Sequence, residues 1–351
     1  MKNIFKAKKN SKFNKHFTPI CEQSAFLKTG RIIKSEFFIA KNKLILVPLV
    51  IICLFLIINP SICSKTCLDA ISVWTFKIFP VMFPFFILTR LILSVGFSYN
   101  PLDRFFNKIY NTPKGSLNVF LLSVLSGYPM GAKMVCNLYE DGKINKQDVY
   151  KMLSFCSICG PMFMIGTVGV NMLDNKTSGV IILISNILAC LINGLIFKGK
   201  KENNNYIVRD QKIDMANCMY DSIISILSVA GYLIFSFIII ALLNHLNIIP
   251  FICAFLANMF KIDKDIIQSI FVGIIEITEG NLLLSKTSIS LGLKTIISSG
   301  IIGFGGISVM LQSLNFLSKC NIDKKIIIKQ KIIQGILSFL LCFIIVKILH
   351  F

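Results

Sequence analysis

The segment Ser126-Gly-Tyr-Pro-Met-Gly-Ala-Lys133 interrupts the apolar stretch Ser116–Asn137. Glycine and proline destabilise helix interiors, so a continuous helix is not expected across it. A second apolar stretch, Ile266–Leu284, contains the interruption Glu276-Ile-Thr-Glu-Gly-Asn281. Irregular backbone at membrane depth is tolerated only where protein buries it or where it lines a cavity. If the chain lies in a membrane, both segments predict broken helices inside the protein.

The composition indicates a membrane protein. Of 351 residues, 54% are hydrophobic and 15% are charged, against about 25% charged residues in a soluble domain. A bilayer is crossed by about 20 apolar residues, and charge-free stretches of that order are Leu44–Ser64, Met152–Leu173, Thr177–Phe197 and Thr295–Ser318. The net charge of +20 comes from lysines between apolar segments, which is typical of topology signals and contacts to anionic lipid. We therefore expect an all-α polytopic protein with the bilayer as partner and no nucleic acid.

The N-terminal region is strongly basic. Residues 1–43 contain eleven Lys and Arg residues, too long a basic region for a signal peptide. We expect a cytoplasmic arm, which either clamps anionic lipid or only sets the topology. Residues 44–60 are expected to form an uncleaved transmembrane anchor.

The rest of the chain repeats one order of elements. We expect a first half at residues 73–197, a polar linker at 198–217 and a second half at 218–349. Each half has a long apolar segment, an interrupted one, a third with a Gly-rich break and a final apolar segment. The expected elements are Val73–Phe97, Ser116–Asn137, Met152–Leu173 and Ser178–Phe197, then Ser222–Leu243, Ile266–Leu284, Thr295–Phe316 and Lys331–Leu349.

The positive charges predict how these segments cross. If each interrupted element is a re-entrant hairpin, 27 of the 37 Lys and Arg residues face the cytoplasm and 7 face the other side. If both elements cross fully, the split is 22 to 12. The positive-inside rule favours the hairpins. The two halves are then inverted repeats in a helical bundle, a plan common among secondary transporters.

The first interruption predicts a substrate site for an anion. Broken helices expose free N–H groups, and helix N-termini favour anions, while Lys133 adds a positive charge. The alternative is a hairpin tip near the surface, with Lys133 reaching the headgroups. The candidate substrate-binding residues here are Ser126, Gly127, Tyr128, Pro129, Gly131 and Lys133, with Gly160 from the break Cys159-Gly-Pro161.

The second half adds candidates for coupling and for the cavity. Glu276 and Glu279 are three residues apart, so a helix would place them on one face, and intramembrane carboxylates are usually functional. They are expected to bind a coupling H⁺ or Na⁺, or to gate the site; a structural ion pair or a wet segment end remains open. Further candidate substrate ligands are Thr278, Gly280, Asn281, Gly305, Gly306, Ser308 and Gln312. Glycine in the Gly303–Gly306 break also permits close helix packing.

Other chemistry is not indicated. His16, His245 and His350 are scattered, so no metal site is expected, and no nucleophile, zinc or phosphate-loop motif is present. We therefore expect neither an enzyme nor a cofactor. The one CxxC, Cys156-Ser-Ile-Cys159, has apolar neighbours, which favours packing over redox chemistry.

Four motifs carry a family resemblance: Phe79-Pro-Val-Met-Phe-Pro-Phe-Phe86, Ser126–Lys133, Ser154–Phe163 and Phe304-Gly-Gly-Ile-Ser-Val309 with Gln312. Together they resemble the YlbJ-like sporulation integral membrane proteins, which carry a nucleoside-recognition "gate" domain in both halves. The resemblance covers residues 45–349. It implies a role in a membrane around the forespore and movement of the dicarboxylate dipicolinic acid toward the spore.

Three functions follow as hypotheses. The first is a secondary transporter of a small organic anion, with dipicolinate as substrate. The second is a nucleoside or cation carrier on the same scaffold. The third is a non-transporting membrane scaffold in spore assembly, for which the basic arm is the longest partner-binding candidate. The sequence leaves the oligomeric state open.

Overall fold

The computed structural model describes residues 46–95, 101–199, 215–320 and 322–351. These residues form helices and connecting turns, and no strand occurs among them. Within the described ranges five helices are long and apolar enough to cross a membrane, namely Pro60–Leu88, Lys176–Ile196, Cys218–His245, Leu291–Leu317 and Lys324–Ile348. The predicted all-α polytopic class is confirmed.

The chain divides into two units, residues 1–58 and 59–351. In the first unit the described part is the apolar helix Leu46–Ile58, and the predicted basic arm at 1–43 lies outside the described residues. Pro60 begins a new helix at the end of the anchor expected at 44–60.

The second unit opens with a long helical segment that begins before the expected Val73. It consists of α2 (Pro60–Val73), a π-helical turn (Trp74–Ile78) and α3 (Phe79–Val95), with Pro84 inside α3. Proline is well tolerated in the first helical turn, which suits Pro60. The π-turn ends two residues before Pro80, a residue that cannot donate a backbone hydrogen bond.

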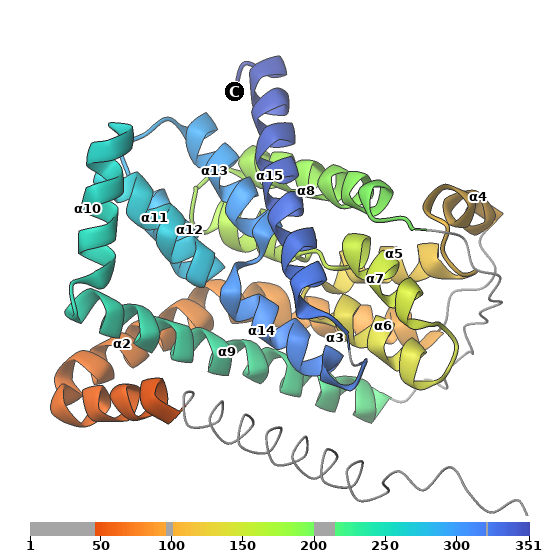
Figure 1. Cartoon of the computed structure of the whole chain (residues 1–351), viewed down its shortest axis with the longest axis horizontal. Helices are drawn as coiled ribbons and strands as arrows, with labels where there is room; N and C mark the ends of the chain where they lie inside the picture. The colour runs from red at the N-terminus through yellow and green to blue at the C-terminus, as the bar shows by residue number, and fades with distance from the viewer. Residues whose placement is uncertain (1–45, 96–100, 200–214, 321) are drawn as a thin grey trace, which may run out of the picture. The chain divides into compact units, whose positions relative to one another are not determined.

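Both interrupted elements fold back on themselves. They are α5 (Ser116–Ser126) with α6 (Met130–Glu140), and α11 (Lys264–Ile275) with α12 (Ile277–Ser285). A Cβ added at Gly131 would lie 2.9 Å from Ser123 Oγ, and one at Gly280 would lie 2.5 Å from Gly273 N. In a continuous helix those partners would be about 10–12 Å apart along the axis. The contacts therefore describe hairpins, and α11 and α12 lie side by side in Figure 1.

The remaining elements follow the same order in both halves. In the first half these are α4 (Pro101–Tyr110), α7 (Lys146–Cys156), a π-helix (Met162–Val170) and α8 (Lys176–Ile196). In the second they are α9 (Met215–His245), α10 (Ile248–Phe260), α13 (Leu291–Phe304), α14 (Gly306–Leu317) and α15 (Lys324–Ile348). The short helices α4 and α10 each precede a hairpin, so they occupy corresponding places in the two halves. The opposite orientation of the halves stays a prediction from the charge count.

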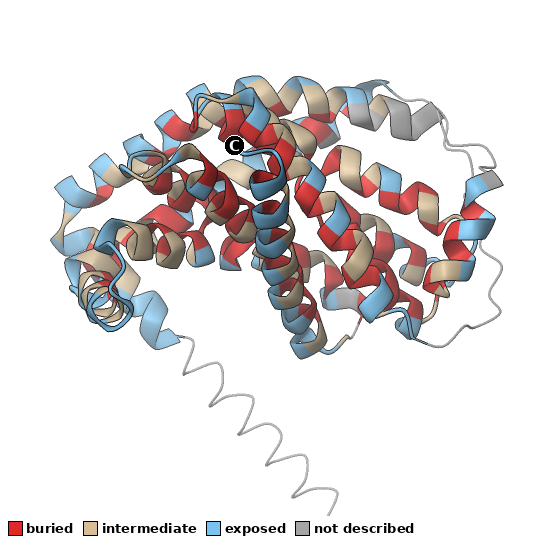
Figure 2. Cartoon of the chain, turned by 90° about the horizontal axis from the view of Figure 1, so that it is seen from above, coloured by how far each residue is buried: buried red, intermediate tan, exposed pale blue. Residues whose placement is uncertain are grey.

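Helices α8, α13 and α15 pack along a buried polar seam. Ser185 and Ser299 hydroxyls are 2.8 Å apart, Asn186 Nδ2 donates to Ser299 Oγ at 3.2 Å, and Ser338 Oγ donates to Asn186 Oδ1 at 3.2 Å. Small and polar residues allow helices to approach closely in a membrane. Buried residues gather on the faces that helices turn toward one another, and exposed ones lie on the outward faces (Figure 2). Many of these outward residues are apolar, which suits contact with lipid.

Candidate functional site

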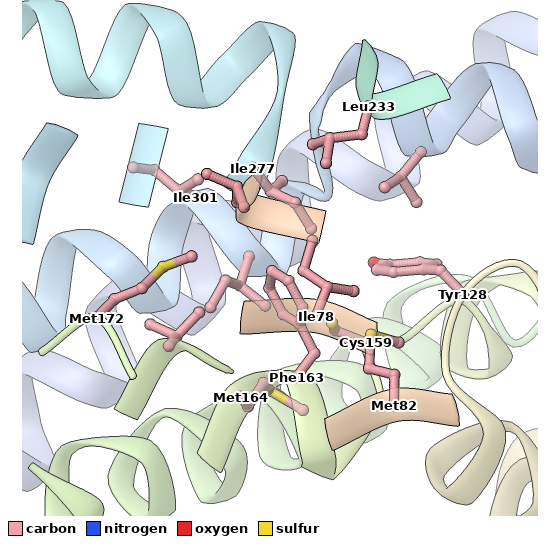
Figure 3. Close-up of a cluster of buried hydrophobic side chains, with 14 of the residues drawn as sticks. Ile78, Met82, Tyr128, Cys159, Phe163, Met164, Met172, Leu233, Ile277 and Ile301 are labelled. Carbon is pink, nitrogen blue, oxygen red and sulfur yellow. The ribbon is translucent and has the colours of Figure 1, made fainter. Parts of the chain in front are cut away.

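The helix breaks of both halves meet at one cavity of about 50 Å³. The α5–α6 turn contributes Tyr128 and the break after α7 contributes Gly160, while the second half contributes residues from the α11–α12 turn and α14. The predicted site residues that line the cavity are Tyr128, Gly160, Glu276, Thr278, Ser308 and Gln312. Figure 3 shows part of its apolar wall, including Ile78, Met82, Phe163 and Leu233.

The cavity is small for an organic ligand. One water needs roughly 10–15 Å³ of such volume, so about 50 Å³ holds a few waters. Typical ligand pockets measure roughly 300–1,000 Å³. Side chains around this cavity must therefore move before an aromatic acid can occupy it.

Glu276 is the carboxylate of the cavity. It ends α11 and begins α12 with extended backbone (φ −141°, ψ 120°), and its Oε2 accepts a hydrogen bond from Glu279 N at 2.7 Å. Its side chain is 3% exposed. The carboxylate thus caps α12, where the helix dipole favours negative charge, and it also reaches the space between the two halves.

Glu279 does not share this position. Because Glu276 precedes α12, the two residues do not follow helical geometry, and Glu279 is not among the residues lining the cavity. Glu279 Oε2 is buried and has no hydrogen-bond partner within the described part of the chain. Glu279 therefore lies in the first turn of α12 next to Glu276 but does not line the cavity with it.

Lys331 is the positive charge beside the cavity, whereas the sequence pattern makes it the first residue of the expected segment Lys331–Leu349 and counts it among the cytoplasmic charges. Helix α15 begins at Lys324, so Lys331 lies two turns inside it and is 4% exposed. Its Nζ donates to Tyr128 Oη, to Ser157 O at 3.1 Å and to Gln334 Oε1 at 3.0 Å. It also lies 4.7 Å from the centre of the Tyr128 ring. The spacing of Lys331, Gln334 and Ser338 on one helix face was the available signal.

The carbonyl of Ser157 gathers the donors of this cluster. Helix α7 ends at Cys156, which frees the Ser157 carbonyl from helical hydrogen bonding. It accepts from Tyr128 Oη, Lys331 Nζ and Gln334 Nε2, each at 3.1 Å. A carbonyl oxygen has two lone pairs, so three donors exceed its capacity. The cluster is therefore rich in donors.

Lys133 lies away from the cavity. It is half-buried, and its Nζ lies 5.9 Å from the centre of the Phe316 ring in α14. It is not among the lining residues. Lys133 therefore does not line the cavity to which Glu276 contributes its carboxylate.

Several predicted glycines serve close backbone approach. A Cβ at Gly127 would lie 2.8 Å from Gly160 Cα, and one at Gly131 would overlap the Cys156 carbonyl oxygen. Gly280 packs on Gly273 in the same manner. These residues hold the breaks together rather than line the cavity.

The other predicted ligands lie at the helix breaks or form hydrogen bonds within their own helices. A Cβ at Gly305 would lie 3.0 Å from Tyr128 Oη, so the α13–α14 break touches the Lys331 cluster. Gly306 begins α14 and Pro129 immediately precedes α6. Asn281 is buried and donates to Ile277 O at 2.6 Å. Ser126 Oγ donates to Leu122 O at 2.7 Å, within its own helix.

The cysteines of the CxxC segment are buried, and Cys159 lines the cavity. In the described ranges no three His, Cys, Asp or Glu side chains gather as metal ligands.

One characterised protein is similar to most of this chain. Over 305 residues the chain is 28% identical to the sporulation integral membrane protein YlbJ of Bacillus subtilis (strain 168). The match covers 78% of this chain and 74% of that protein. No family model matches the chain, and no solved structure matches it. The similarity confirms the resemblance that the motifs predicted.

Proposed function

We propose that this chain, which is similar over most of its length to the sporulation integral membrane protein YlbJ, is a secondary transporter of a small organic anion. The favoured substrate is dipicolinic acid, moved toward the forespore across a surrounding membrane. The observation that carries the proposal is the cavity at which three helix breaks from both halves converge beside α14. Secondary transporters bind substrate between repeats, at discontinuous helices.

The helix ends around the cavity favour an anion. Helices α6, α12 and α14 each begin at a break. Met130 N of α6 donates to Gly127 O and Glu279 N of α12 donates to the Glu276 carboxylate, whereas the first N–H groups of α14 have no partner within their helix. Helix N-termini attract negative charge. A dicarboxylate such as dipicolinate supplies two such groups on a flat apolar ring, which suits the apolar wall of the cavity.

Glu276 is the coupling residue in this proposal. Its carboxylate is buried between the halves, and a bound H⁺ or Na⁺ removes a charge that is costly to bury. Cation binding also neutralises repulsion between Glu276 and an anionic substrate. Substrate and cation then enter together, which is the requirement of coupled transport.

Uptake by reconstituted protein tests the proposal. Purified protein in liposomes is expected to take up labelled dipicolinate faster than liposomes without protein, and unlabelled dipicolinate should compete. A pH or Na⁺ gradient should change the rate. No uptake above the protein-free liposomes under any gradient would reject the function.

A nucleoside or cation carrier is the second candidate. Glu276, Thr278 and Gln312 offer carboxylate, hydroxyl and amide groups around the cavity, and these also suit a cation or a nucleoside. Competition between substrates separates the two candidate functions. If uridine inhibits uptake and dipicolinate does not, the nucleoside carrier is favoured.

A further inference from the structure

We infer that Lys331 is the residue that binds a carboxylate of the transported anion, and that Tyr128 separates it from the cavity in the present conformation. This inference rests on the proposed function and names the group that recognises the substrate. Nothing in the sequence pattern singles out Lys331, because it is one of the 27 Lys and Arg residues expected to face the cytoplasm.

Lys331 carries its positive charge in the interior of the protein. A buried lysine at membrane depth is costly and normally pairs with an acidic group. Among the described residues two lysines are deeply buried, Lys151 and Lys331. Lys151 Nζ pairs with Asp148 Oδ1 at 3.0 Å. Lys331 donates to a phenol, a carbonyl and an amide, all neutral. Lys331 is therefore a buried cation with no acidic side chain among its hydrogen-bond partners in the described part of the chain.

The hydrogen bonds point the same way. Lys331, Tyr128 and Gln334 all donate to the Ser157 carbonyl, which has fewer lone pairs than donors. An ionised carboxylate offers two oxygens with about four acceptor positions. Binding one there would give each donor a stronger, charge-assisted partner.

The position of Tyr128 supplies the route. Its side chain lines the cavity, and its hydroxyl is bonded to Lys331. Gly305 lies on another side, since a Cβ there would be 3.3 Å from Lys331 Cε. Rotation of Tyr128 would therefore open Lys331 to the cavity. The second carboxylate of a dicarboxylate then lies toward the N-terminus of α14 at the cavity, and cation binding at Glu276 removes repulsion there.

A charge-selective binding assay tests the inference. Purified protein in detergent is titrated with dipicolinate and with pyridine-2,6-dicarboxamide, a neutral analogue of the same shape. Lys331→Met should weaken dipicolinate binding about 10- to 100-fold, the range for a hydrogen bond to a charged group. Diamide binding should be unchanged, so the preference for the acid is lost.

Lys347→Met is the matched control, because Lys347 is an exposed lysine on the same helix, with Nζ 5.2 Å from the Phe343 ring centre. It should bind both compounds as wild type does. If Lys331→Met is not recovered folded, Lys331→Arg is used instead. Lys331→Arg keeps the positive charge, so it should keep the preference for the acid. If Lys331 acts only through its shape, that preference is lost.

Two outcomes overturn the ideas separately. Wild-type protein that binds dipicolinate, with Lys331→Met retaining the same affinity and the same preference over the diamide, overturns the inference alone. Wild-type protein that binds uridine and not dipicolinate overturns the proposed function together with the inference.

Discussion

Replacing Gly280 by alanine tests whether α11 and α12 form a hairpin. The new Cβ would lie 2.5 Å from Gly273 N and 2.9 Å from Ser269 O, against 3.4–4 Å for an ordinary contact. Both of these atoms belong to the backbone of α11, so a rotamer change cannot relieve the overlap. The two helices must separate.

The sign of the stability change is diagnostic. In an ordinary helix, Gly→Ala gains about 1 kcal/mol. Overpacking typically costs about 1–3 kcal/mol and occasionally more, and here backbone rather than a side chain must move. We expect a net loss of up to about 2 kcal/mol when these two effects are combined.

Thermal unfolding of purified protein in detergent measures this change. Gly231→Ala in α9 is the control, because Gly231 is exposed and a Cβ there meets no atom within 4 Å. Its midpoint should equal or exceed that of wild type, and that of Gly280→Ala should fall below it. A Gly280→Ala midpoint at or above wild type would refute the hairpin, since a single crossing helix keeps Gly280 and Gly273 about 10 Å apart.

Three further substitutions address coupling and packing. Glu276→Gln keeps an acceptor for the α12 cap but cannot ionise, so dipicolinate uptake in proteoliposomes should no longer respond to a cation gradient; an unchanged response would exclude Glu276 from coupling. Lys151→Met leaves Asp148 buried without its cation and should cost about 3–5 kcal/mol of stability in thermal unfolding. If the ion pair is the cause, the double substitution Lys151→Met with Asp148→Asn should recover most of that stability. Ser299→Ala should cost about 0.6 kcal/mol, the average for polar contacts between membrane helices, whereas Ser228→Ala, at an exposed hydroxyl, should not change the unfolding midpoint; equal midpoints for both would argue against the seam.

Much of the fold was predictable because membrane helices have strong length and composition signals. The breaks at Ser126–Lys133 and Glu276–Asn281 followed from helix-breaking residues and an intramembrane carboxylate. Tyr128 and Gln312 followed because polar residues beside such breaks face the protein interior. The limits of the helices were harder, and Pro60 begins a helix where the sequence pattern suggested a connection.

The incorrect predictions depend on two properties that the sequence pattern does not give: the direction in which a helix turns each side chain, and the residue at which each helix begins. Lys133 lies beside a break in the sequence, but it is the fourth residue of α6, and that turn directs it to Phe316. Glu279 was paired with Glu276 on the assumption of one helix, which the cap at Glu276 interrupts. Lys331 is predicted to begin the last apolar segment, because lysine near an apolar segment normally marks its end. A charge count cannot distinguish a topology signal from a buried cation.

The two halves share their order of elements but not their chemistry at the cavity. Gly127 ends α5 where Glu276 ends α11, and Lys331 comes from the last helix of the second half, whereas its partners Tyr128 and Ser157 come from the first. A homodimer of the second half would therefore carry both charges twice, and a homodimer of the first half would carry neither of them. If the chain arose by duplication, the ancestral dimer had a different site, and specialisation followed once fusion allowed the two copies to diverge.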